Sequence, residues 1–295
     1  MSERMKPTTK ITVRKIQIGI LLGMAVIAVF VWVAALSENR GHLLRVSFLD
    51  VGQGDAILIE APNGNRVLID GGPPSGKILS ELGDMLPFFD RELGVVIATH
   101  PDMDHIGGLP AVFERYSVGA LFEPDLYAGN GVYEAMEKHA EKESARKIVA
   151  RPGEIIRLDK NIKLEILYPE HKFAPNADTN SSSVVVKLTY GNESFLFTGD
   201  LPKEQENALA EKYGTALHAN VLKFGHHGSK TSTSEEFLTA VAPEYGVVSV
   251  GSENKYGHPN QETLDLAAKE NVEVLRTDMM GRVVFETDGV TLIKK

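Results

Sequence analysis

Hydrophobic residues follow two different patterns along this chain. One apolar stretch, IQIGILLGMAVIAVFVWVAAL, runs from residue 16 to residue 36 without a charged side chain. After it, short runs rich in Val, Ile and Leu, such as AILIE, VVIAT and SVVVKLTY, recur between Gly, Asp and Asn residues. Runs of this kind are typical of buried strands. The pattern therefore predicts an apolar segment followed by a strand-rich globular region.

Stretches with helical spacing lie between the strand-like runs. They cover residues 77–86, 104–116, 131–143, 202–213, 234–241 and 261–269. Pro202 stands where one of these helices should begin, and Asp200 just before it is a suitable cap. Strands and helices alternate through the middle of the chain, and strands neighbour one another at both ends. We therefore expect a layered α/β sandwich of two mixed sheets with helices outside, although periodicity does not give the strand order.

The apolar stretch 16–36 is long enough to cross a membrane, because about 20 apolar residues in a helix span the hydrocarbon core. An excess of positive charge before a span predicts that this end stays in the cytoplasm. A cleaved signal peptide is the alternative, with Val33 and Ala35 at its cleavage site. The stretch exceeds the roughly 7–15 apolar residues of a signal core, which favours an anchor. The basic residues before the stretch, opposed by Glu3 alone, are Arg4, Lys6, Lys10, Arg14 and Lys15.

These observations predict four segments. Residues 1–15 would form a cytoplasmic basic tail, 16–36 a transmembrane helix, 37–42 a linker and 43–295 a single domain. The protein would then be a single-pass protein of the cell membrane, held there through residues 16–36, with its domain outside the cytoplasm. The sequence identifies no protein partner.

Composition narrows the classes of function. Hydrophobic residues make up 43% and charged residues 24% of the 295 residues, which excludes disordered, collagen-like and multi-span membrane proteins. The chain has no cysteine, so disulfide scaffolds, Cys-ligated zinc and thiol catalysis are excluded. The net charge is −9, divided into +4 over residues 1–40 and −13 over the remainder. An acidic domain does not bind nucleic acid broadly through its own charge, but metal ions bound in a cleft could supply the positive charge that nucleic acid needs to enter that cleft.

The residues that carry chemistry follow buried strands. VVIAT runs directly into HPDMDHIGG, so that His100, Asp102, Asp104 and His105 lie within six residues. Loops at strand ends are where sites are built, and His and Asp are ligands for divalent ions. The adjacent Asp104 and His105 cannot easily reach one ion together with the other two residues. The cluster therefore predicts a two-metal site.

Three further loops supply candidates. Asp200 follows SFLFTG and is well placed to bridge two ions, and His226 and His227 follow NVLKF. We favour His226 of this pair as the ligand because it comes first after the strand, with His227 as the alternative. His258 follows GVVSVG and is a candidate proton donor. Each of these His and Asp residues, taken alone, has a structural explanation: aspartates cap helices, and a loop histidine can make a purely structural hydrogen bond. Their occurrence together in loops after apolar strands favours metal binding.

Six segments of the sequence resemble motifs of a known family. The motifs that carry the resemblance are VSFLDVGQGDAILIE, VLIDGG, ATHPDMDHIGG, FLFTGD, LKFGHHGSKTSTS and VSVGSENKYGHP. They resemble the metallo-β-lactamase fold hydrolases, and most closely the ComEC/Rec2-like branch associated with DNA uptake, over about residues 44–290. The resemblance implies a four-layer αββα sandwich, here preceded by one transmembrane helix, and a metal-dependent hydrolase.

The resemblance also implies a ligand set, with two departures. The wider fold usually has a histidine where this chain has Asp102, and another in the region where this chain has Asn180 and Ser183, which match the Asn-x-x-Ser pattern of the branch. Carboxylate and amide ligands shift preference toward harder ions, so we expect two divalent ions, zinc first and manganese second. One ion would be held by His100, Asp102 and Asp200 with help from Asn180, and the other by Asp104, His105, Asp200 and His226 or His227.

The expected function is that of a membrane-anchored phosphodiesterase or nuclease, with DNA as a candidate substrate. Water held between the ions would be activated to hydroxide and attack the phosphoryl group, with Asp104 and His258 as catalytic residues. One alternative is an extracytoplasmic hydrolase of another ester or amide, because one fold hosts many chemistries. A second is a catalytically silent binding module. In the ComEC-like branch the domain belongs to a longer protein with a multi-span channel, whereas this sequence has one apolar span, so no pore is expected.

Overall fold

The computed structural model describes residues 7–38, 43–174 and 177–295. It divides the chain into two compact units, Met1–His42 and Leu43–Lys295. Parts of two expected segments, residues 1–6 of the basic tail and 39–42 of the linker, lie outside the described residues.

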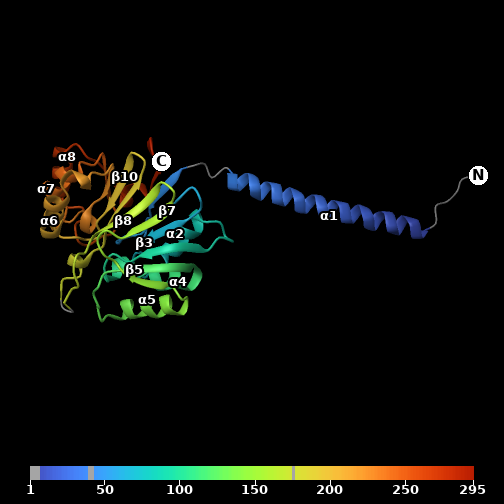
Figure 1. Ribbon diagram of the computed structural model, residues 1–295, viewed down its shortest axis with the longest axis horizontal. Coiled ribbons are helices and arrows are strands. Elements are labelled where there is room, and N and C mark those ends of the chain that lie inside the picture. The colour runs from blue at the N-terminus through green and yellow to red at the C-terminus, as the bar shows by residue number, and fades with distance from the viewer. Residues whose placement is uncertain (1–6, 39–42, 175–176) are drawn as a thin grey trace, which may run out of the picture. The chain divides into compact units, whose positions relative to one another are not determined.

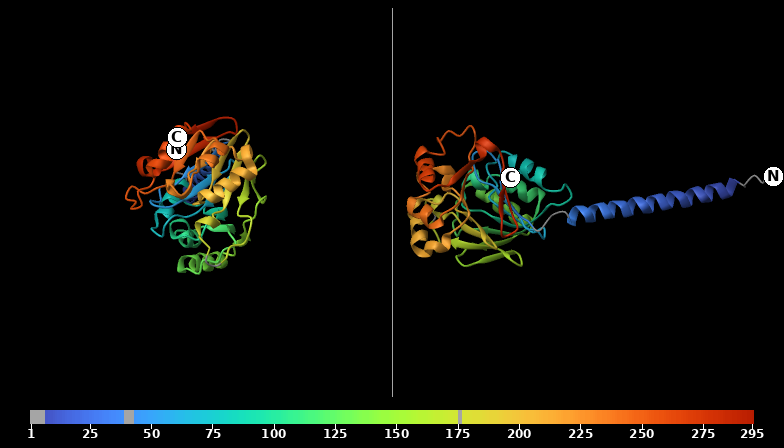
Figure 2. Two further views of the ribbon diagram at one scale, coloured as in Figure 1. Left: turned by 90° about the vertical axis from the view of Figure 1, so that its left-hand side faces the viewer. Right: turned by 90° about the horizontal axis from the view of Figure 1, so that it is seen from above.

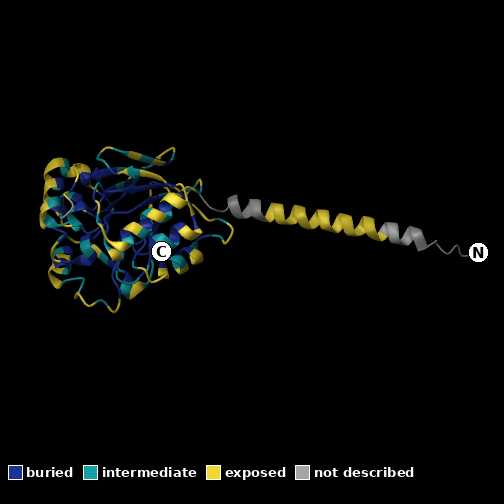
Figure 3. Ribbon diagram, turned by 90° about the horizontal axis from the view of Figure 1, so that it is seen from below, coloured by how far each residue is buried: buried dark blue, intermediate teal, exposed yellow. Residues whose placement is uncertain are grey.

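The first unit contains one helix, α1 (Pro7–Glu38), which begins within the expected basic tail. Its segment Arg14–Trp32 has a mean hydropathy of 2.1, and its side chains are exposed along the whole segment, shown in yellow in Figure 3. By length and composition this helix could cross a membrane.

The second unit is built on two sheets. The first sheet has the strand order β15-β14-β1-β2-β3-β4-β5-β6, and the second has the order β13-β12-β11-β10-β9-β8-β7. The strands are β1 (Leu44–Phe48), β2 (Ile57–Glu60), β3 (Arg66–Ile69), β4 (Glu92–Ile97), β5 (Ser117–Glu123), β6 (Arg146–Val149), β7 (Ile155–Asp159), β8 (Ile162–Tyr168), β9 (Val185–Tyr190), β10 (Glu193–Phe197), β11 (Val221–Lys223), β12 (Tyr245–Val248), β13 (Glu273–Arg276), β14 (Val283–Thr287) and β15 (Leu292–Lys294).

Helices cover the outer faces of both sheets (Figures 1 and 2). Apolar residues of α2, α4 and α5 pack on the first sheet, and those of α6, α7 and α8 pack on the second. The result is the expected αββα sandwich. The helices are α2 (Lys77–Met85), α3 (Met103–Ile106), α4 (Leu109–Arg115), α5 (Gly131–Lys142), α6 (Lys203–Tyr213), α7 (Glu235–Val241), α8 (Gln261–Lys269) and α9 (Thr277–Met280), with short 3₁₀ turns η1 (Asn180–Ser182), η2 (Gly214–Leu217) and η3 (Gly225–Gly228).

The main core lies between the two sheets. Phe48 and Phe285 of the first sheet pack against Phe197 and Phe195 of the second, with ring centroids 6.1 Å and 5.9 Å apart, respectively. All four rings are buried, so their transfer from water favours the closed sandwich. This core fixes one sheet against the other and therefore fixes the loops that both sheets carry at their ends.

Strand direction gathers the chemistry at one edge. β3, β4 and β5 run parallel in the first sheet, and β10, β11 and β12 run parallel in the second. The loops that leave the carboxyl ends of β4, β10 and β11 carry His100, Asp200 and His226, respectively. We call this end of the sandwich the metal edge.

Two details of the expected helices are wrong. The stretch 104–116 is divided into α3 and α4 because Gly107 and Gly108 pack tightly: a Cβ on Gly107 would lie 2.3 Å from the carbonyl oxygen of Met103. Asp200 does not cap α6. Pro202 occupies that cap position without a side-chain hydrogen bond, and Asp200 is turned into the metal edge.

Candidate metal centre

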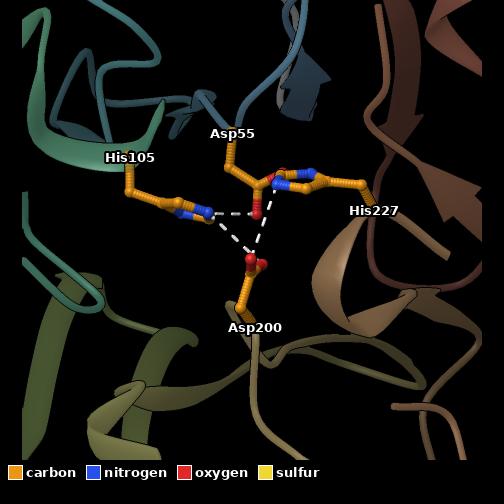
Figure 4. A group of neighbouring side chains, drawn as sticks. All are labelled: Asp55, His105, Asp200 and His227. Carbon is orange, nitrogen blue, oxygen red and sulfur yellow. Dashed lines mark ion pairs between the residues drawn. The ribbon is translucent and has the colours of Figure 1, made fainter. Parts of the chain in front are cut away.

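Four buried side chains converge at the metal edge. One ligand atom each from Asp55, His105, Asp200 and His227 lies within 4.8 Å of the others (Figure 4). His105 Nε2 is 3.3 Å from Asp200 Oδ1, and His227 Nε2 is 3.5 Å from Asp200 Oδ2. The two oxygens of one carboxylate therefore face two different imidazoles. This is the geometry of a bridging ligand.

The HPDMDH segment surrounds this cluster. His227 Nε2 lies 3.2 Å from Asp104 Oδ2, and His100 Nε2 lies 3.8 Å from Asp102 Oδ2. Asp102 occupies the cap position of α3, yet its side chain makes no cap hydrogen bond. The capping explanation for Asp102 is therefore not supported.

Hydrogen bonds fix which nitrogen each imidazole presents. Thr99 donates its hydroxyl to Asp70 Oδ2 at 2.7 Å, so its oxygen is free to accept the Nδ1–H of His100 at 3.0 Å. His105 donates Nδ1–H to the same Asp70 oxygen at 2.8 Å, and His227 donates Nδ1–H to the Ser249 carbonyl at 2.9 Å. In their neutral forms, all three rings therefore present the lone pair of Nε2. Such outer partners orient the histidines of metal sites.

Three imidazoles stand in a row at the metal edge. The ring centroids of His100 and His105 are 4.0 Å apart, and those of His105 and His227 are 5.3 Å apart. His100 lies beside Asp102 at one end of the row and His227 beside Asp104 at the other. Asp200 lies within 3.5 Å of the two imidazoles of His105 and His227.

Of the two neighbouring histidines, the structure brings His227 and not the favoured His226 to Asp104. Both residues have φ in the left-handed region, 49° and 54°, so that the chain turns sharply within η3. This turn buries His227, with 1% of its side chain exposed, and leaves His226 29% exposed. His226 Nε2 lies 3.8 Å from Asp200, and its ring faces His258 at a centroid distance of 5.6 Å. Both imidazoles lie within 3.8 Å of Asp200, and the sharp turn makes His227 the more buried of the two, so which histidine binds metal stays a prediction.

The remaining two candidates lie around the centre. The Oδ1 atom of Asn180, in η1, is buried and has no hydrogen-bond partner among the described residues. Ser183, three residues later, accepts the backbone N–H of Asp200 at 3.0 Å and so holds the bridging residue. Asn254 clamps the backbone of His258 by accepting its N–H at 3.0 Å and donating to its carbonyl at 2.9 Å. The His258 ring is thereby held beside His226.

Asp55, Asp70 and Lys223 are not among the metal ligands predicted from the sequence. Asp55 ends the GQGD loop, which packs directly on the HPDMDH turn: Gly54 has φ +138°, and a Cβ there would lie 2.1 Å from the carbonyl oxygen of Asp104. The buried Lys223 ammonium forms an ion pair with Asp55 and lies 3.6 Å from Asp200 Oδ1. A charged residue within or directly after an apolar strand is the signal that could have found Lys223 in β11 and Asp70 after β3, whereas Asp55 stands just before β2 and gives no such signal.

Burial and charge together set the pKa values of the centre. Burial alone would lower the pKa of His227, but the carboxylates of Asp200, Asp104 and Asp55 outweigh it and raise the pKa to about 9. The same balance raises the pKa of His105 well above its ordinary value. Burial lowers the pKa of His100 to about 3, assisted by the neighbouring His105. Burial would raise the pKa of Asp55, but Lys223 and the histidines hold it at about 2.

The donor set fits divalent metal ions. His100 Nε2, His105 Nε2 and Asp200 Oδ1 are buried and make no aligned hydrogen bond within the described part of the chain. Buried polar atoms normally have partners, so a group of them converging on one place indicates a ligand. Imidazole nitrogens and carboxylate oxygens suit zinc, manganese and similar ions. In the metal-free protein, protons on His105 and His227 neutralise the same carboxylates.

Metal affinity should therefore rise with pH. The raised pKa values mean that His105 and His227 both carry protons at neutral pH, and an incoming ion must displace those protons. Affinity should increase from pH 6 to pH 9, and the contribution of His227 to this increase should end above its pKa of about 9. Calorimetry in buffers of different ionisation enthalpy should show about two protons released per centre at pH 7.

A His226→Ala variant is the matched control for this titration. Burial lowers the pKa of His226, so its ring carries little charge near neutral pH. Proton release should be unchanged in this variant if His227 is the ligand. An affinity that does not vary with pH would contradict the protonated state of the free centre.

Comparisons with known proteins agree with this geometry. A family model described as the metallo-beta-lactamase superfamily matches residues 49–252. The chain is 34% identical to the ComE operon protein 3 of Bacillus subtilis over 81% of this chain and 32% of that protein. It is 31% identical to the competence protein ComA of Neisseria gonorrhoeae, over 85% of this chain and 33% of that protein. The chain thus spans about a third of the length of these relatives.

Solved structures show the same fold at low sequence identity. The metallo-beta-lactamase fold protein YhfI from Bacillus subtilis superposes with a TM-score of 0.55 and 14% identity, covering 83% of this chain and 100% of that chain. CmlA, a diiron beta-hydroxylase from Streptomyces venezuelae, superposes with a TM-score of 0.55 and 13% identity over 85% of this chain and 54% of that chain. The family match, the competence relatives and the buried Asp/His centre lead to one conclusion. The chain belongs to the metallo-β-lactamase superfamily, in its ComEC-like competence branch.

Proposed function

We propose that this protein is a metal-dependent phosphodiesterase that acts on nucleic acid outside the cytoplasm. The observation that carries the proposal is the row of three imidazoles presenting Nε2 around one carboxylate, Asp200, whose two oxygens face different rings. The superfamily is generally one of metallohydrolases, and the relatives named as competence proteins favour nucleic acid over other esters. Zinc is the preferred ion, with manganese second.

The roles of the residues follow from their positions. His100, Asp102 and Asn180 would hold one ion, Asp104, His105 and His227 the other, and Asp200 would bridge them. Bound ions would supply a polarised phosphoryl oxygen and a water of lowered pKa. Asp70, Thr99 and Ser249 keep the three imidazoles in the required tautomers. Asp104 also faces the centre with one carboxylate oxygen, where it can orient the attacking water.

His258 is the proposed proton donor to the leaving group. It stands beside His226 at the mouth of the centre, and its Nδ1 makes no hydrogen bond within the described part of the chain. Burial, with the nearby His226 and His227, lowers the pKa of His258. A lowered pKa makes the protonated ring a stronger acid and confines its use to the acid side of its ordinary range.

His258→Ala should slow hydrolysis of substrates that have poor leaving groups by about 10²–10⁴-fold, the usual contribution of a general acid. The loss should shrink for a nitrophenyl phosphodiester, because nitrophenolate leaves without a proton. The assay compares single-stranded DNA, RNA and the nitrophenyl ester with the full chain in the presence of Zn²⁺ or Mn²⁺. An equal loss for all three substrates would assign His258 to binding or to structure.

Asp104→Asn is the companion variant for the hydrolase proposal itself. It keeps the side-chain shape but removes the charge of a proposed ligand, so all three substrates should lose hydrolysis together. If the wild type cleaves an ester or amide substrate but cleaves no phosphodiester, the alternative hydrolase is favoured. If the wild type, Asp104→Asn and His258→Ala all hydrolyse the substrates no faster than the uncatalysed background, the silent binding module is favoured.

The apolar helix is proposed to anchor the protein, with its basic N-terminal end in the cytoplasm. Its segment Arg14–Trp32 has the length and hydropathy of a span. The charge bias of residues 1–15 supports the orientation. A reporter enzyme that works only outside the cytoplasm, fused after Lys295, should be active. Activity of a cytoplasmic reporter alone would overturn the orientation.

A further inference from the structure

Two aromatic side chains stand exposed at the end of the sandwich opposite the metal edge. Phe88 and Phe89, in the loop between α2 and β4, are 85% and 83% exposed. Adjacent phenylalanines in this state are unusual on a folded domain, because each leaves a large apolar surface in water. An exposed pair of this kind indicates an interaction surface.

Strand pairing places this loop at the end of the domain where β1 begins. β1 starts at Leu44, β3 at Arg66 and β4 at Glu92, and β3 and β4 run parallel. Arg45 pairs in register with Glu60, the last residue of β2, so β1, β3 and β4 all begin at one edge. In Figure 1 the blue start of β1 and the loop after α2 lie at the same end of the domain.

A chain of ion pairs runs along this edge. Arg45 Nη1 lies 3.8 Å from Glu60 Oε2, Glu60 Oε1 lies 3.5 Å from Arg66 Nε, and Arg66 Nη2 lies 2.7 Å from Asp90 Oδ2. The chain begins in the first strand and ends at the residue after Phe89. Arg66 is buried, so this end of the network is held firmly. The two phenylalanines are thus supported by a fixed edge close to the chain's entry into the domain.

Two basic side chains lie next to the phenylalanines, and of the acidic residues beside them Asp90 is paired with Arg66 while Glu92 is exposed. The Arg91 guanidinium lies 5.1 Å from the centroid of the Phe88 ring, and Arg91 donates Nε–H to the Phe88 carbonyl at 3.4 Å. A pocket of about 140 Å³ beside them is lined by Phe88, Arg91, Arg115 and Tyr116, among others. Two arginines around exposed aromatic rings contrast with the net charge of −13 over residues 41–295. Aromatic rings with adjacent arginines suit the headgroup level of an anionic bilayer.

We propose that the loop carrying Phe88 and Phe89 docks onto the surface of the lipid bilayer. This inference rests on the anchoring part of the proposed function, since the chain would leave the membrane and enter the domain at this same edge through Leu43. The phenylalanine rings enter the boundary between headgroups and acyl chains, and Arg91 and Arg115 contact lipid phosphates. Docking at this edge turns the opposite one, with its metal centre, away from the membrane and toward a substrate in solution.

The absence of cysteine makes the test direct, because one introduced cysteine accepts a single fluorescent label. Phe89→Cys reports the docking loop, and Tyr256→Cys is the matched control: Tyr256 is an aromatic residue 70% exposed in the loop after β12, at the metal edge. Phe30→Cys, within α1, reports whether the apolar helix is in the bilayer. Each labelled full-length chain is reconstituted into phosphatidylglycerol-containing vesicles with spin-labelled lipids.

Docking predicts fluorescence loss at position 89 with spin labels near the headgroup and no loss at position 256. A second substitution, Phe88→Glu, should restore the fluorescence at position 89, because a carboxylate opposes entry into an anionic surface. No quenching at position 89 overturns docking, whatever happens at position 30. Quenching that persists with Phe88→Glu also overturns it, since tethering alone then explains proximity. Energy transfer between labels at position 89 on different copies, without quenching by lipid, would assign the surface to self-association.

Absence of quenching at position 30 by spin labels deep in the bilayer would instead overturn the anchoring proposal. The two failures are therefore distinguishable in one set of samples.

Discussion

Lys223→Met should destabilise the metal-free protein by about 3–5 kcal/mol, the usual effect of removing one partner from a buried ion pair. The Lys223 side chain is 1% exposed, and its ammonium pairs with Asp55, lies 3.6 Å from Asp200 and donates to the Gly199 carbonyl at 2.9 Å. Its removal leaves two buried carboxylates without their neighbouring cation. Divalent ions should recover part of the loss, because they bring positive charge to the same carboxylates.

Urea unfolding with and without Zn²⁺ measures this effect. A Lys223→Met/Asp55→Asn double variant should be more stable than Lys223→Met alone, because the stranded charge is gone. Lys212→Met is the surface control: Lys212 pairs with Glu170 at 2.6 Å, but both side chains are nearly half exposed, so the loss should stay below about 1 kcal/mol. Equal destabilisation by the buried and surface substitutions would show that Lys223 does not support the centre.

Asp200→Asn should remove both ions and lower kcat at least about 10³-fold, since metal ions contribute several kcal/mol to transition-state stabilisation. One oxygen of Asp200 faces His105 and the other faces His227. The ion pair of Asp102, in contrast, is with His100, at one end of the row of imidazoles. Asp102→Asn should therefore weaken one ion and leave the other bound.

Metal content after dialysis, measured by mass spectrometry, separates the two variants. Circular dichroism and thermal unfolding show whether each remains folded, because Asp200 also balances the charge of Lys223. The metal content of Asp200→Asn should fall below that of Asp102→Asn. Full occupancy in folded Asp200→Asn would mean that other residues build the centre.

Part of the candidate centre could be predicted because its proposed ligands are close in sequence to strong strand signals. His100 and His105 belong to one turn, and Asp200 directly follows an apolar strand, so their roles are visible in short segments. Asp55 and Lys223 could not be paired in this way. They come from different sheets, and only the packing of the sandwich brings their charges together.

The expected fold was right in its layers, and three of the observed strands give only weak signals in the sequence. In β5, Gly119 interrupts the apolar run. A Cβ at Gly119 would lie 2.7 Å from the Gly94 carbonyl of β4, so close strand contact requires the glycine. β6 and β7 are edge strands with mostly exposed or half-exposed side chains, so their sequences look like loops. A hydrophobic pattern reveals a strand because its buried side chains are apolar, and an edge strand has few buried side chains.

The candidate metal centre takes its ligands from both sheets, so it can form only after both sheets have folded. The first sheet supplies Asp55 and His105, and the second supplies Asp200 and His227, which is 172 residues beyond Asp55 in the chain. The chain then returns to the first sheet for β14 and β15. Contacts over such sequence separations are slow to form in folding. A newly made chain therefore holds no complete ligand set until its two sheets have closed on each other, and capture of metal marks the end of folding.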